Sequence, residues 1–141
     1  MTYEKRIADD WISTYSHASV IDDFRDPLIY IEIVVDHEAA YGWSILSEVF
    51  ERDIEGTSLP MLVAGPFDSW IKRHSGEWIE FLTNEARSNP RVKWALGGIS
   101  RGTLEETVWR RLKKARGPVW PSNEVPLPPP PRRSDRGSEA I

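Results

Sequence analysis

Apolar residues recur every three or four positions between residues 58 and 99, and prolines and glycines divide this stretch into short pieces. Such spacing places apolar side chains on one face of an α-helix. Proline ends or kinks a helix because it lacks an amide hydrogen and clashes with the preceding turn, and glycine often follows the last helical residue. The stretch therefore predicts several short amphipathic helices, with boundaries at Gly65-Pro66, near Gly76, at Asn89-Pro90 and at Gly97-Gly98. It constrains what the whole chain can fold into.

The same spacing predicts further helices at residues 3–18, 36–53 and 103–116. The segment 28–35 is ambiguous, because its β-branched residues favour a buried strand by propensity. No other segment alternates in a way that would provide a partner strand, and an unpaired strand leaves backbone groups without hydrogen bonds. We therefore predict a fully buried helix for residues 28–35.

Two short motifs predict how helices begin. Ala64–Asp68 reads as a joint between helices, in which Gly65 leaves the helical conformation, Pro66 starts the next helix and Asp68 lies in its first turn. Thr103 and Glu106 have the spacing of a capping box, in which each side chain accepts a hydrogen bond from the other residue's backbone. Ser58 is predicted to cap a short helix that has Pro60 in its first turn.

The composition changes after Gly117, since seven of the eleven prolines lie between Pro118 and Pro131. Such a segment favours polyproline II and disorder. Pro128 and Pro131 also match a PxxP ligand pattern, which a proline run produces by chance. We predict an all-α fold, a compact orthogonal or HEAT-like bundle of five to seven short helices over residues 1–116, with a disordered proline-rich tail at 117–141.

The chain has 141 residues and no cysteine, so disulfides, thiolate metal sites and cysteine nucleophiles are excluded. It shows no apolar signal core and no run long enough to span a membrane, which predicts a cytoplasmic protein. We expect no metal and no cofactor, because Asp22 and Asp23 are two adjacent carboxylates without further spaced acids. Nothing in the sequence indicates the oligomeric state.

Charge divides the chain into two halves. Residues 1–56 carry thirteen acidic and four basic side chains, a balance of −9, whereas residues 57–141 carry nine and fourteen, a balance of +5. Such an acidic half is typical of a solvated helix face or of a surface that binds a basic protein partner, and we take Asp9, Asp10, Asp22 and Asp23 as candidate binding residues. We expect no nucleic-acid partner for the basic residues between 110 and 116, because no exposed aromatics are interleaved with them.

The leading hypothesis is a non-catalytic protein-interaction module, with an immunity or antitoxin role as its narrower form. The chain lacks a phosphate-binding loop, a nucleophile elbow and a zinc-protease motif. The alternative is a hydrolase-like enzyme in which His74 works with Glu77 or Asp68. Trp70 is a candidate binding residue beside His74, although tryptophan in a small domain more often packs in the core.

Residues 5–115 resemble an uncharacterised bacterial domain family of unknown function. The resemblance rests on Leu62–Asp68, which matches a Leu-Ala-Ala-Gly-Pro-Leu-Glu-like motif, and on the matching segments His74–Gly76, Trp78-Ile79, Ala86-Arg87 with Pro90, and Glu38 to Trp43. The chain departs from the pattern at His37, Phe67, Asp68 and Ser75. The resemblance implies an all-helical fold, which supports a helix at 28–35, and it implies no activity.

Overall fold

The structure is a computed structural model that describes residues 2–16, 38–119 and 127–129, without the side chains of residues 14–16. Every regular element in these ranges is helical, which confirms the all-α class. The predicted helix at 28–35 lies outside the described residues, as do Asp22 and Asp23. The elements are α1 (Tyr3–Ser16), α3 (Ala39–Arg52), α4 (Leu59–Leu62), the π-helical turn η1 (Val63–Phe67), α5 (Asp68–Ser88), α6 (Pro90–Leu96) and α7 (Glu106–Ala115).

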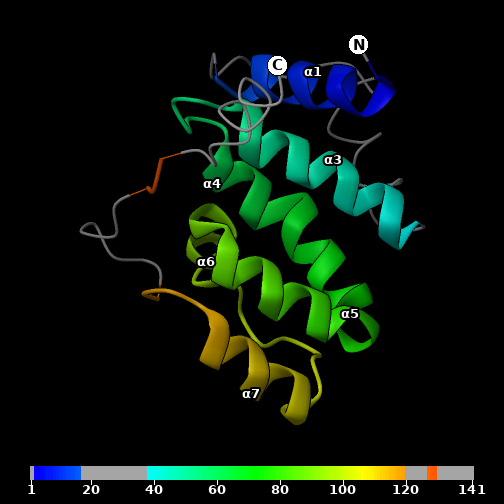
Figure 1. The fold of residues 1–141 in the computed structure, drawn as a ribbon, viewed down its shortest axis with the longest axis vertical. Helices are drawn as coiled ribbons and strands as arrows, with labels where there is room; N and C mark the ends of the chain where they lie inside the picture. Colours follow the sequence, from blue (N-terminus) through cyan, green and yellow to red (C-terminus); the bar gives the residue numbers. More distant parts are fainter. Residues whose placement is uncertain (1, 17–37, 120–126, 130–141) are drawn as a thin grey trace, which may run out of the picture.

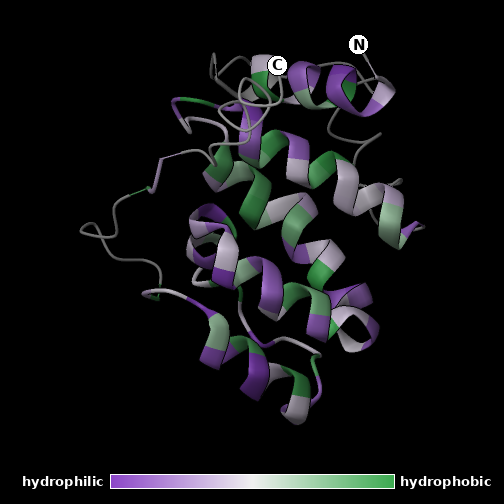
Figure 2. Ribbon diagram, in the orientation of Figure 1, coloured by the Kyte–Doolittle hydropathy of each residue, from purple (hydrophilic) through white to green (hydrophobic). Residues whose placement is uncertain are grey.

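The helices are stacked largely in chain order (Figure 1). α1 packs on α3, α3 packs on α5, and α5 contacts both α6 and α7. Hydrophobic positions alternate with hydrophilic ones along each helix, as Figure 2 shows, so each layer can bury one face against the next. The two ends of the stack are therefore α1 with α3 and α7 with the second half of α5.

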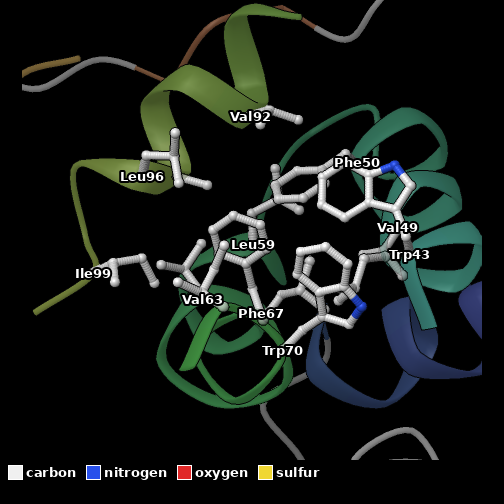
Figure 3. Packing of buried hydrophobic residues seen from close by; sticks show 14 of the residues in the cluster. Trp43, Val49, Phe50, Leu59, Val63, Phe67, Trp70, Val92, Leu96 and Ile99 are labelled. Carbon is white, nitrogen blue, oxygen red and sulfur yellow. The ribbon is translucent and has the colours of Figure 1, made fainter. Parts of the chain in front are cut away.

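Aromatic and branched side chains from three layers meet in one core (Figure 3). Trp43 and Phe50 come from α3, and Phe67 and Trp70 come from η1 and α5. Phe50 and Phe67 meet edge to face with ring centroids 5.4 Å apart, an arrangement that aromatic quadrupoles favour. The prediction that tryptophan packs in the core holds for Trp11, Trp43 and Trp70, which are all buried.

The joint at Gly65 and Pro66 takes a different form from the predicted one. The backbone stays helical from α4 to α5 and passes through η1, which contains Pro66. A π-helical turn shifts hydrogen bonding from the fourth to the fifth residue, and this spacing accommodates a residue that has no amide hydrogen. The prediction that Gly65 leaves the helical conformation is therefore wrong, whereas Asp68 does begin α5.

The predicted boundary between helices near Gly76 appears as a kink inside α5. Trp78 has φ −107° and ψ 16°, which are not helical values, and Figure 1 shows that α5 changes direction along its length. The non-helical residue lies two positions after Gly76. The end of α5 at Ser88 and the start of α6 at Pro90 agree with the predicted positions, and Asn89 caps α6 by accepting a hydrogen bond from the Arg91 amide.

Two predicted caps are not formed. Ser58 precedes α4 as expected, but its hydroxyl donates a hydrogen bond to the Asp53 carboxylate instead of accepting one from the helix. Thr103 is exposed in a turn, and α7 starts only at Glu106, whose carboxylate accepts from Arg110. Gly102, with φ 52°, turns the chain so that Leu104 enters the core, and this delays the helix start beyond Thr103.

Part of the segment predicted as a disordered tail contacts the helices. The Gly117 amide donates to the Lys93 carbonyl at 3.0 Å, and a Cβ on Gly97 would lie 2.1 Å from the Pro118 carbonyl oxygen. Leu127 lies against Gly56, whose φ of 77° favours glycine. Residues 117–119 and 127–129 therefore pack on α6 and on the loop between α3 and α4. The rest of the tail lies outside the described residues.

Candidate functional site

The residues of the hydrolase alternative share α5, but they do not form one described cluster. The Asp68 carboxylate binds Lys72 Nζ at 2.7 Å and lies beside a shallow hollow with Ser69 and Arg73. His74 follows six residues later, about 9 Å along the axis and on another face of the helix. The structure therefore does not bring Asp68 to His74, and the catalytic role of His74 stays a prediction.

The imidazole of His74 is half-buried and lies against Trp70, with ring centroids 5.5 Å apart. Glu77 is exposed one turn later, just before the kink at Trp78. Trp70 is completely buried, and its indole nitrogen donates to the Ala39 carbonyl at 2.9 Å. A side chain enclosed in this way packs α5 against the start of α3 and presents no surface to a partner.

Ser75 is completely buried in α5, and its hydroxyl has no hydrogen-bond partner among the described residues. We expect Ser75→Ala to stabilise the protein by about 1 kcal/mol, because alanine removes a buried polar group and favours the helix. Urea unfolding followed by tryptophan fluorescence measures the difference. Gly76→Ala on the neighbouring exposed position controls for helix propensity alone, and a destabilised Ser75→Ala variant would show that the hydroxyl is satisfied in the native protein.

A second candidate site is the acidic face, which we define as the acidic side chains of α1, α3 and the loop after α3. Asp9 accepts two hydrogen bonds from Arg52 at 2.7 Å, and this contact raises the pKa of Arg52. Burial and the nearby Glu4 carboxylate raise the pKa of Tyr41. Asp9 thus joins α1 to α3, whereas Asp10 is exposed on the outer surface.

The acidic face includes more residues than the predicted Asp9 and Asp10. Besides Asp10, the exposed acids at this end of the stack are Glu38 at the start of α3 and Glu55 after its end. Glu48 and Glu51 are half-buried, and both act on Arg52 electrostatically to favour its charged form. Of the four predicted acidic binding residues, Asp9 is an ion-pair partner, Asp10 is exposed, and Asp22 and Asp23 lie outside the described residues.

Sequence reasoning missed a buried polar cluster formed by Asp53, Ser58 and Arg91. The guanidinium of Arg91 donates to the carbonyl of residue 50 in the last turn of α3 and to the carbonyls of residues 53 and 54 just after it. It also donates to the carbonyl of Pro128. The Asp53 carboxylate accepts from the amides of Gly56 and Ser58 at 3.0 and 2.9 Å. Burial lowers the pKa of Arg91, partly offset by Asp53. The sequence signal that could have revealed this cluster is the position of Arg91 four residues before Ala95, on the face of α6 that is buried.

Two other features, a metal site and a membrane span, are not found among the described residues. No three histidine, aspartate or glutamate side chains gather there as a metal site would need. A membrane-spanning helix is likewise absent from this part of the chain, since none of its helices has the required length and apolar content.

These features define a small all-helical domain whose acidic end and basic end are separated by an aromatic core. A family model described as a family of unknown function (DUF6869) matches residues 26–119, which is more than half of the chain. The chain belongs to this family. The match runs from the segment before α3 to the residues packed on α6, and it leaves α1 outside. Comparison with curated proteins and with solved structures finds no match.

The family confirms that the chain is related to proteins of unknown function, as the resemblance implied. The bacterial origin and the particular motif at Leu62–Asp68 stay predictions. Because the family carries no assigned activity, the function has to be argued from the surfaces of this domain.

Proposed function

We propose that this chain is a non-catalytic protein-interaction module of the bacterial cytoplasm that binds a partner with a basic surface through its acidic face. The observation that carries the proposal is the separation of charge along the stack. At the α1–α3 end, the described acidic side chains outnumber the basic ones, which are Lys5, Arg6 and Arg52. The acidic side chains with surface exposure there are Glu4, Asp9, Asp10, Glu38, Glu48, Glu51 and Glu55.

Charge separation of this kind favours association with a complementary surface. Clustered charges of one sign create a long-range potential that steers an oppositely charged partner and raises the association rate by 10- to about 1000-fold at low salt. The ion pair of Asp9 with Arg52 holds α1 against α3, so the remaining carboxylates are presented on a fixed support. Masking of a basic toxin by an immunity protein is the narrower form of this proposal.

The hydrolase alternative has less support. Asp68 is held by Lys72, and His74 lies six residues further along α5. A general base needs a positioned nucleophile or polarising group within hydrogen-bond reach. The ring contact of His74 is with Trp70, which belongs to the core.

Charge reversal at the acidic face tests the proposal. We expect the triple variant Asp10→Lys, Glu38→Lys and Glu55→Lys to lose partner binding by at least about tenfold, because it reverses three exposed charges of the steering potential. Wild type and variant are used as bait in a lysate of the source bacterium, and recovered proteins are quantified by mass spectrometry. Binding by wild type should weaken as salt rises.

The matched control reverses three exposed acids near the other end, Glu77, Glu105 and Glu106, with the same change in net charge. It should recover the partner as wild type does. Equal recovery by both triple variants, or equal loss from both, would rule out a specific role for the acidic face. Circular dichroism checks that all three proteins have the same helical content.

A further inference from the structure

A hollow of about 440 Å³ lies at the opposite end from the acidic face. It is lined by the second half of α5, by α6 and by α7 with the residue that follows it. Its floor consists of the small side chains of Thr83, Ala86 and Ala115. Five basic residues complete the described part of the lining, which includes no carboxylate: Arg87, Lys93, Arg111, Lys114 and Arg116.

The partners of these cations leave much of the positive charge unbalanced. Arg111 binds Glu80 at 2.7 Å, which lowers the pKa of Glu80, and Arg116 lies over the Trp109 ring at 5.4 Å. Lys93 and Lys114 are exposed and have no ion-pair partner among the described residues. Only one of the five cations is therefore paired with a carboxylate in this part of the chain.

Helix dipoles do not account for this excess of charge. The lining residues lie near the C-terminal ends of α5, α6 and α7, and each helix end carries at most about half a negative charge. Three such ends and Glu80 together offset about half of the five positive charges. The remaining charge faces a concave surface, where the lower dielectric constant and the converging cations strengthen attraction of an anion.

We propose that this hollow binds a small anion with several adjacent phosphoryl groups, the chemistry shared by nucleoside di- and triphosphates and by inorganic polyphosphate. Arginine guanidinium groups bind phosphate oxygens in bidentate fashion, and lysines add charge without fixed geometry. The volume lies within the range of small-molecule sites. The small side chains of Thr83, Ala86 and Ala115 leave room for such an anion among the cationic side chains.

The lining argues against a nucleic acid as the occupant. Proteins that bind single strands combine a basic groove with aromatic side chains on which the bases stack. No aromatic side chain among the described residues lines this hollow, and the nearby Trp109 ring is covered by Arg116. A compact phosphate anion uses the cations without needing such a platform.

Isothermal titration of the full chain with inorganic tripolyphosphate at low salt tests the inference. We expect saturable binding with one site per chain, which weakens as salt is added. Lys114→Glu should weaken binding by at least about tenfold, because it removes one charge-assisted contact and introduces a repulsive one. The matched control is Lys113→Glu, an adjacent exposed lysine on the same helix that does not line the hollow, which should change the affinity less than threefold.

The outcomes separate the possibilities. Unsaturable binding by wild type, or equal loss from Lys113→Glu and Lys114→Glu, would show only a diffuse positive field and overturn the proposal. Tighter binding of a single-stranded oligonucleotide, lost on Lys114→Glu, would reassign the hollow to nucleic acids. Because Lys114 is exposed, thermal unfolding should be the same for both variants and wild type. The result is independent of the acidic face.

Discussion

Arg91→Met should destabilise the domain by about 3–5 kcal/mol, the cost typical of breaking a buried charged network. Arg91 is 1% exposed and is the common donor to three carbonyls at the end of α3 and to the Pro128 carbonyl. Methionine fills part of the volume but leaves these buried acceptors without donors. It also leaves the Asp53 carboxylate buried without the nearby positive charge. Equilibrium unfolding in urea measures the difference.

Two further variants show whether the hydrogen-bond geometry or the charge of Arg91 is responsible for the stability that it provides. Arg91→Lys keeps the charge but offers a single ammonium group in place of the planar guanidinium, so it should recover only part of the loss. Arg73→Met, on the exposed surface of α5, should change the free energy of unfolding by less than about 0.5 kcal/mol. An Arg91→Met variant as stable as Arg73→Met would contradict the role given to the buried guanidinium.

Helix positions could be predicted from the sequence where apolar spacing and prolines agree. The spacing of Trp43, Leu46 and Phe50 indicated α3, and Asn89 with Pro90 indicated the boundary between α5 and α6. Both signals are local, since they act within one or two helical turns. Gly97 and Gly98 likewise indicated the end of α6, which the structure places at Leu96.

The errors arose where distant contacts decide the conformation. Pro66 interrupts an isolated helix, but packing of Phe67 and Trp70 on α3 keeps the chain helical through a π turn. Thr103 has a capping sequence, yet burial of Leu104 requires a turn at that position. Local propensity contributes about 1 kcal/mol at such sites, and burial of a large side chain contributes more.

The candidate sites were predictable only in part. Counting charges revealed the acidic half, but it could not show that Asp9 is used to join α1 to α3. The basic residues of α7 were visible in the sequence, whereas the hollow also needs Arg87 and Lys93 from two other elements. Such a site depends on how three helices pack, and no local spacing encodes that arrangement.

The role of Trp70 leads to the second large expected effect. Trp70→Ala should destabilise the domain by about 3–5 kcal/mol, because it removes a large side chain from a closed core and leaves a cavity. The ring contacts Trp43 at 5.1 Å and Trp78 at 5.8 Å between centroids, and it bridges α3 to the kink in α5. Urea unfolding monitored by circular dichroism avoids the change in fluorescence that the substitution itself causes.

Trp70→Phe separates packing from the hydrogen bond to Ala39. Phenylalanine keeps most of the apolar contact but leaves the Ala39 carbonyl without the indole donor, so we expect a loss of about 1–3 kcal/mol, smaller than that of alanine. Met61→Ala, at a half-exposed position on α4, should cost less than either variant of Trp70. If Trp70 served a partner and not the core, both of its variants would unfold at the urea concentration of wild type. Stability that rises in the order alanine, phenylalanine, wild type would assign Trp70 to the packing of α3 on α5.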